Sequence, residues 1–81
     1  MSRVEVYVAT GCHLCPPTLL AAQEACAARG LEPRVIDIDG DPDLERRYRV
    51  AIPVVLVDGV EVGRFAVTAG EIASVLDRTG S

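Results

Sequence analysis

The chain has 81 residues, of which 49% are hydrophobic, so we expect residues 1–81 to form a single domain with a compact interior. The net charge is −4, and all eight basic residues are arginines that are dispersed apart from a group in the middle of the chain. With only three aromatic residues, this composition argues against a nucleic-acid-binding surface and against a base-stacking platform.

The first residues contain neither the apolar core of a secretion signal nor a small-residue cleavage site. No apolar run approaches the roughly 20 residues that a membrane span requires. We therefore expect a cytoplasmic protein without a membrane partner. The three cysteines are an odd number, and in a reducing compartment a CxxC motif is more often catalytic or metal-binding than structural.

Apolar and polar residues alternate from Val4 to Val8, which predicts a first strand. Small and apolar residues from Thr18 to Arg29 predict a helix that ends at Gly30. Two prolines follow the CxxC motif, and a helix tolerates proline only in its first turn. Either the regular helix begins near Pro16, with Cys12 in the loop before it, or its first turn is distorted; we expect the former.

The segment Pro33–Ile38 is predicted to be a second strand, joined to the first through a helix and hence parallel to it by a right-handed crossover. Asp41 followed by Pro42 and an acidic first turn is typical of a capped helix start. The short helix that follows is expected to bury Leu44 and Tyr48, which are four residues apart, and to expose its arginines.

The run Val54–Val57 is apolar on both faces, as in a covered central strand. Asp58–Gly59 predicts a tight hairpin, so that Val60–Val62 returns antiparallel as an edge strand. Thr68–Glu71 predicts a capping box for a last helix that frays beyond Asp77. The predicted buried face of this helix consists of Ile72, Val75 and Leu76. The predicted order is β-α-β-α-β-β-α, an α/β fold with a four-stranded mixed sheet flanked by three helices.

Cys12 and Cys15 lie where the first strand ends and the first helix begins. In a helical first turn, residues three apart have Cβ atoms about 5–6 Å apart. A disulfide requires Cα atoms roughly 4.4–6.8 Å apart, so the pair can close and reopen with little backbone movement. The positive end of a helix favours a thiolate, and only the thiolate attacks a disulfide sulfur. The spacing therefore predicts a redox-active dithiol.

The element order, with CxxC after the first strand and a proline just before the third, resembles the thioredoxin fold in its short, glutaredoxin-like version. The residues that carry the resemblance are Val6–Val8, Gly11–Cys15, Val35–Asp39 and Tyr48–Gly59. The chain is most similar to small bacterial glutaredoxin-like proteins whose active site reads Cys-His-Leu-Cys. The resemblance implies a cis peptide bond between Ile52 and Pro53 and places that proline against the dithiol. It also implies that the backbone before the proline pairs with an incoming peptide or glutathione, with Leu14 as a further substrate-binding residue.

The chain departs from glutathione-using members of that family at two places. Ala9 and Thr10 stand where those members often have a lysine shortly before the first cysteine. Gly63 stands alone where they carry two glycines followed by acidic residues before the last helix.

Within the motif, Cys12 is the expected nucleophile and Cys15 the expected resolving thiol. His13, when protonated, would stabilise the Cys12 thiolate; alternatively, it is an exposed loop residue that shapes the surface beside the disulfide. Cys26 lies eleven residues beyond Cys15, roughly 16 Å along a helix, which is too far for a disulfide with either thiol. Its apolar neighbours favour a core position over a regulatory thiol.

The remaining charged candidates have simpler interpretations. Arg46, Arg47, Arg49 and Arg64 could hold a carboxylate of a glutathione-like thiol or an acidic patch on a partner, but a solvated surface is the favoured explanation. Asp37 and Asp39 are assigned to turn and cap chemistry, and we expect no metal site.

These features predict a thiol–disulfide oxidoreductase that reduces disulfides of proteins or low-molecular-weight compounds as a monomer without a resident cofactor. Its electrons would come from glutathione, another low-molecular-weight thiol or a flavoprotein reductase. One alternative is a metal or iron–sulfur cluster carrier that uses the same cysteines, although small copper and zinc carriers usually have the order β-α-β-β-α-β; a dimer bridged by a cluster through Cys12 stays open. A second alternative is a thioredoxin-like interaction domain without turnover.

Overall fold

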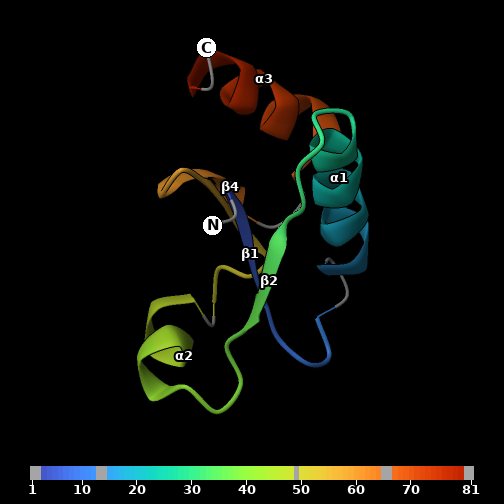
Figure 1. Cartoon of the computed structure of the whole chain (residues 1–81). Coiled ribbons are helices and arrows are strands. Elements are labelled where there is room, and N and C mark those ends of the chain that lie inside the picture. Colours follow the sequence, from blue (N-terminus) through green and yellow to red (C-terminus); the bar gives the residue numbers. More distant parts are fainter. Residues whose placement is uncertain (1–2, 13–14, 49, 65–66, 80–81) are drawn as a thin grey trace.

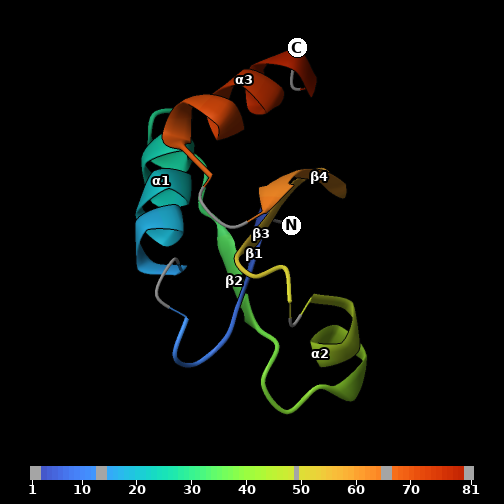
Figure 2. The same cartoon turned by 180° about the vertical axis from the view of Figure 1, so that it is seen from behind.

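The computed structural model describes residues 3–12, 15–48, 50–64 and 67–79. The elements in chain order are β1 (Val4–Val8), α1 (Cys15–Ala27), β2 (Arg34–Asp37), α2 (Pro42–Tyr48), β3 (Val54–Val57), β4 (Val60–Arg64) and α3 (Ala69–Thr79). Figures 1 and 2 together show these elements, and their order confirms the predicted β-α-β-α-β-β-α arrangement. None of the helices in the described part of the chain is long and apolar enough to cross a membrane.

The four strands form one mixed sheet in the order β2-β1-β3-β4. β1 and β2 are parallel, whereas β3 is antiparallel to both β1 and β4. Asp58 and Gly59 have φ angles of 51° and 82°, as the hairpin between β3 and β4 requires. β4 extends to Arg64, beyond the predicted end at Val62, with a shift of register between Val55 and Leu56. The predicted central position of β3 is confirmed.

The core lies between one face of the sheet and the helices α1 and α3. Val4 and Val6 of β1 face the same side as Val57 and Val55 of β3, and none of the four side chains is exposed. The core residues that complete this cluster from the rest of the chain are Ala22, Ala25, Cys26, Val67, Ile72 and Leu76. Figures 1 and 2 show α3 lying across the end of α1 on this side. Cys26 is therefore a core residue, as predicted.

The end of α1 follows from the glycine at position 30. Leu31 N donates to Cys26 O at 2.8 Å and Gly30 N donates to Ala27 O at 3.3 Å, while Gly30 has a φ of 69°. This pattern is a Schellman motif, in which a left-handed glycine closes the last helical turn. The predicted role of Gly30 as the helix stop is confirmed.

The predicted capping box begins α3. Thr68 N donates to Glu71 Oε1 at 3.0 Å, and Glu71 N donates to Thr68 Oγ1 at 3.2 Å. Ile72 and Leu76 are buried as predicted, but the predicted burial of Val75 was wrong: its side chain is half-buried and packs against the core cluster without being part of it.

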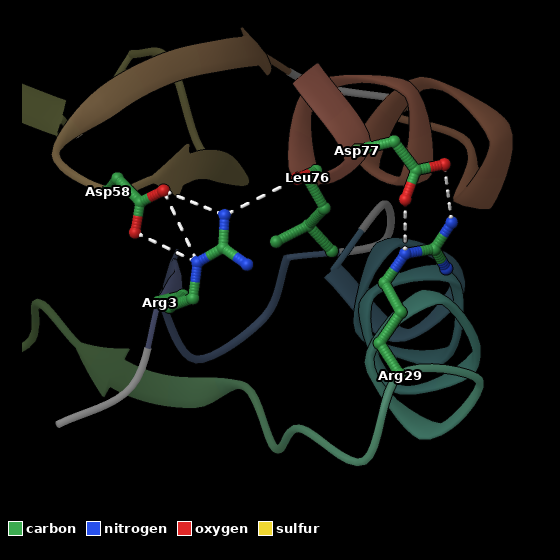
Figure 3. A network of polar contacts seen from close by, with 5 residues as sticks. All are labelled: Arg3, Arg29, Asp58, Leu76 and Asp77. Carbon is green, nitrogen blue, oxygen red and sulfur yellow. Dashed lines mark hydrogen bonds and ion pairs between the residues drawn. The ribbon is translucent and has the colours of Figure 1, made fainter. Parts of the chain in front are cut away.

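The last turn of α3 is held by two arginines from distant parts of the chain, and the helix continues to Thr79 instead of fraying after Asp77. Arg29, just after α1, donates two hydrogen bonds of 2.9 Å to the Asp77 carboxylate. Arg3 donates to the Asp58 carboxylate and, at 3.3 Å, to Leu76 O. Figure 3 shows both guanidinium groups reaching α3 from below. The prediction of early fraying was wrong because these long-range contacts are invisible in the local sequence.

α2 lies at the end of the sheet away from α1 and α3, as Figures 1 and 2 show. The predicted cap is confirmed, because Asp41 Oδ1 accepts hydrogen bonds from Asp43 N at 3.1 Å and Leu44 N at 3.2 Å. The predicted burial of Leu44 and Tyr48 was wrong: both are half-buried, and none of the seven residues of α2 is buried. Tyr48 instead stacks on Tyr7 of β1, with ring centroids 4.3 Å apart and planes inclined by 19°.

Candidate active site

Three segments converge at one edge of the sheet. In the parallel pair, Val8 at the end of β1 lies beside Asp37 at the end of β2. In the antiparallel pair, Tyr7 lies opposite Val54, the first residue of β3. The loop after β1, the loop after β2 and the residues just before β3 therefore leave the sheet at the same edge.

The two cysteines of the CxxC motif lie at the junction between the first of these loops and α1. Their Cα atoms are 5.5 Å apart and their sulfur atoms are at disulfide distance, which confirms the predicted proximity. Cys12 is half-buried in the loop, whereas Cys15 is 4% exposed and is the first residue of α1. The two prolines that follow occupy the first helical turn, where no backbone donor is needed. The regular helix thus begins one residue before Pro16, with Cys12 outside it.

Cys12 is placed by a tight turn formed by residues 9–12. Cys12 N donates to Ala9 O at 3.3 Å, and Gly11 has a φ of 83°. A positive φ at the third position of a hydrogen-bonded four-residue turn is the pattern of a type II turn, for which glycine is the favoured residue. The glycine before the motif therefore directs the chain from β1 to the first sulfur.

A carboxylate from the second loop contacts this turn. Asp39 Oδ2 accepts a hydrogen bond of 2.9 Å from Thr10 N. The prediction that Asp37 has a local role in a turn is confirmed, because its Oδ1 accepts a hydrogen bond of 2.8 Å from Asp39 N. For Asp39 that prediction is incomplete, because its carboxylate reaches the loop of the CxxC motif. The predicted parallel pairing of the first two strands could have indicated this contact, because it brings the carboxyl ends of both strands to one edge of the sheet.

The third segment contains Ile52 and Pro53, whose peptide bond is cis. Pro53 is fully buried, and Ile52 is half-buried. The preceding turn is closed by Ala51 N, which donates to Tyr48 O at 2.8 Å. The two residues predicted to bind substrate thus lie at the edge of the sheet from which the cysteine loop also leaves.

Three further candidates, His13, Leu14 and Arg49, lie outside the described residues, so their proposed roles stay predictions. Arg46 and Arg64 are exposed and pair with carboxylates three residues earlier in the chain, at 3.1 and 3.0 Å. The remaining described arginine of this group is Arg47, whose Cζ atom lies 5.9 Å from the centre of the Tyr48 ring.

Cys26 differs from Cys12 and Cys15 in its surroundings and in its pairing. It is unpaired and completely buried, and this burial raises the pKa of its thiol, an effect that the positive charge of Arg29 partly offsets. A raised pKa leaves less of the reactive thiolate at neutral pH. Among the described residues, no group of three or more histidine, cysteine, aspartate or glutamate side chains is arranged to hold a metal ion.

Comparison with known proteins gives a consistent family assignment. A family model described as Glutaredoxin-like domain (DUF836) matches residues 3–77. No match to a curated protein was found.

Three solved structures illustrate the likeness. The X-ray structure of target protein XcR50 from X. campestris has a TM-score of 0.78 and 27% identity, covering 94% of this chain and 97% of that chain. Protein Ne2328 from Nitrosomonas europaea has a TM-score of 0.72 and 28% identity, covering 90% and 88%. Fasciola hepatica thioredoxin has a TM-score of 0.56 and 27% identity, covering 93% and 77%. The match over nearly the whole chain, with the four-stranded mixed sheet and three helices, shows that the chain belongs to the glutaredoxin-like domain family and has the thioredoxin fold.

Proposed function

We propose that this protein is a thiol–disulfide oxidoreductase that uses Cys12 and Cys15 as its reactive pair. The observation that carries the proposal is the position of the pair at the start of α1, with both sulfurs at disulfide distance and Cys12 the more exposed of the two. The family membership and the likeness to a thioredoxin support it.

In the proposed reaction, the Cys12 thiolate attacks one sulfur of a substrate disulfide. A mixed disulfide forms, and the other substrate sulfur leaves as a thiolate that takes up a proton. The Cys15 thiolate then attacks the Cys12 sulfur, which closes the Cys12–Cys15 disulfide and releases the second substrate thiol. Two electrons pass from the dithiol to the substrate, and an external thiol or a flavoprotein reductase returns them.

The surroundings of the pair suit these two steps. The exposed side of Cys12 gives an incoming disulfide access, whereas the buried position of Cys15 directs its sulfur toward Cys12 rather than toward solvent. Unpaired amides and the dipole at the start of a helix stabilise a nearby thiolate. We assign the contact with the substrate backbone to Ile52 and Pro53, with Leu14 beside them, and the electrostatic support of the Cys12 thiolate to His13.

The test is a single-turnover reaction that needs no knowledge of the natural electron donor. The prereduced protein is mixed with a neutral disulfide, 2-hydroxyethyl disulfide, and the products are identified by mass spectrometry after acid quenching. We expect one substrate disulfide to be reduced per protein, and the mass of the chain to fall by that of two hydrogen atoms as Cys12–Cys15 closes. Cys12→Ser should abolish the reaction, whereas Cys26→Ala, as the matched cysteine control, should retain it. Failure of the native protein to reduce this disulfide or insulin would overturn the proposal.

A further inference from the structure

The two parallel strands β1 and β2 end in turns of the same kind. After β1, Cys12 N donates to Ala9 O, and the third residue of the turn is Gly11 with a φ of 83°. After β2, Asp41 N donates to Ile38 O at 3.1 Å, and the third residue is Gly40 with a φ of 87°. Each glycine has the positive φ of a type II turn, and the residue before each glycine has a negative φ.

The two turns are bonded to each other through their second residues, which are Thr10 and Asp39. Thr10 N donates to Asp39 Oδ2 at 2.9 Å. The turn that contains Asp39 is itself fixed to the sheet, because Ile38 is 1% exposed and its amide donates to Val8 O at 2.9 Å. Asp39 N is held in addition by Asp37 Oδ1. The buried Ile38 thus fixes the position of Asp39, whose exposed carboxylate accepts the hydrogen bond from Thr10 N in the turn before Cys12.

We propose that Asp39 is a positioning residue for Cys12: its carboxylate holds the turn of residues 9–12 and thereby keeps the Cys12 sulfur in the place from which it reacts. The proposal rests on the proposed function of Cys12. Asp39 acts through the Thr10 amide and not on the substrate. Hydrogen bonds from an amide to a carboxylate are among the stronger ones, so a single contact of this kind can fix a short turn.

The test measures the rate at which iodoacetamide alkylates Cys12 in the reduced full-length protein at neutral pH, with the modified cysteine identified by fragment masses. Asp39→Ala removes the acceptor and should slow alkylation about fivefold, the factor that corresponds to the net loss of one ordinary, solvent-exposed hydrogen bond. Asp39→Asn keeps an acceptor oxygen without the charge and should stay within about twofold of the native rate. This rescue by the conservative variant separates positioning from a mere effect of charge.

Asp41→Ala is the matched control, since it removes the same charge from the same turn and deletes the cap of α2 without touching Thr10. We expect native alkylation in this variant. Native alkylation in Asp39→Ala, an equal loss in Asp39→Asn, or an equal loss in Asp41→Ala would each overturn the proposal.

A second variant, Thr10→Pro, removes the same contact with Asp39 left in place, so the proposal stays testable if Asp39→Ala disturbs folding. Proline is favoured at the second position of a type II turn, and this variant should by itself slow alkylation about fivefold, whereas a native rate would overturn the proposal. In this background Asp39→Ala should cause no further change, because the two mutations remove the same contact. A further loss of about fivefold would show that Asp39 acts by another route. Alkylation requires no turnover, so these results stand even if the single-turnover assay shows that the protein reduces no disulfide.

Discussion

The burial of Cys26 makes a prediction about stability that separates a core residue from a regulatory thiol. Its side chain is unexposed in the cluster that also contains Val4 and Ile72. Cys26→Ala removes one sulfur atom and should cost about 1 kcal/mol in the free energy of unfolding, close to the value for one buried methylene. Cys26→Ser keeps the volume but places a hydroxyl among apolar groups, which should cost about 2 kcal/mol.

For 81 residues, an unfolding entropy of about 2.1 cal/mol/K per residue gives about 0.17 kcal/mol/K. The melting temperature should therefore fall by about 6 °C in Cys26→Ala and by about 12 °C in Cys26→Ser. Circular dichroism under reducing conditions measures both values. Titration of the native reduced protein with a thiol reagent should show slow reaction of Cys26, which becomes fast only in denaturant. Equal melting temperatures for the serine variant and the native protein, or rapid native labelling of Cys26, would refute a core role.

Three further predictions concern the mechanism and the last helix. Cys15→Ser should stop at the mixed disulfide on Cys12, so that covalent adducts with substrate proteins accumulate on non-reducing gels; their absence would contradict the assigned order of attack. Thr68→Ala removes the hydroxyl that accepts a hydrogen bond from Glu71 N and should cost about 1 kcal/mol, measured by urea denaturation. The hydrogen bonds and positive charge of Arg29 lower the pKa of Asp77. Because this pKa is lower in the folded state, the ion pair stabilises the fold at pH values above the ordinary pKa of the carboxyl. This stabilisation is lost as the pH falls through the pKa of the folded state. Asp77→Asn should flatten the decline of the urea midpoint over that acidic range, and an unchanged decline would contradict the contact.

The local sequence was sufficient to predict those structural features that are stabilised by residues close together in the chain. The alternation from Val4 to Val8, the cap at Asp41, the Schellman glycine at position 30 and the capping box at Thr68 were all predictable, because each depends on contacts within a few residues. The proximity of the two cysteines belongs to the same class, since i and i+3 residues meet at a helix start.

The sequence was insufficient to predict contacts between segments that are far apart in the chain. Leu44 and Tyr48 have helical spacing, but that spacing does not reveal that α2 lies beyond the end of the sheet, where Tyr48 meets Tyr7 instead of a core. The carboxylate of Asp39 has an obvious local use, and its contact with Thr10 emerges only from the pairing of β1 with β2. The proximity of Cys12 and Cys15 was therefore predictable from the sequence, whereas the contact between Asp39 and the turn before Cys12 was not.

The most direct test of the central claim is a redox titration of the Cys12–Cys15 pair in the native protein. The protein is equilibrated in thiol–disulfide buffers of graded ratio, quenched by alkylation, and resolved by the mass added to each free thiol. We expect a single two-electron transition in which Cys12 and Cys15 change together while Cys26 stays reduced. A pair that forms no intramolecular disulfide at any buffer ratio would contradict the proposed function.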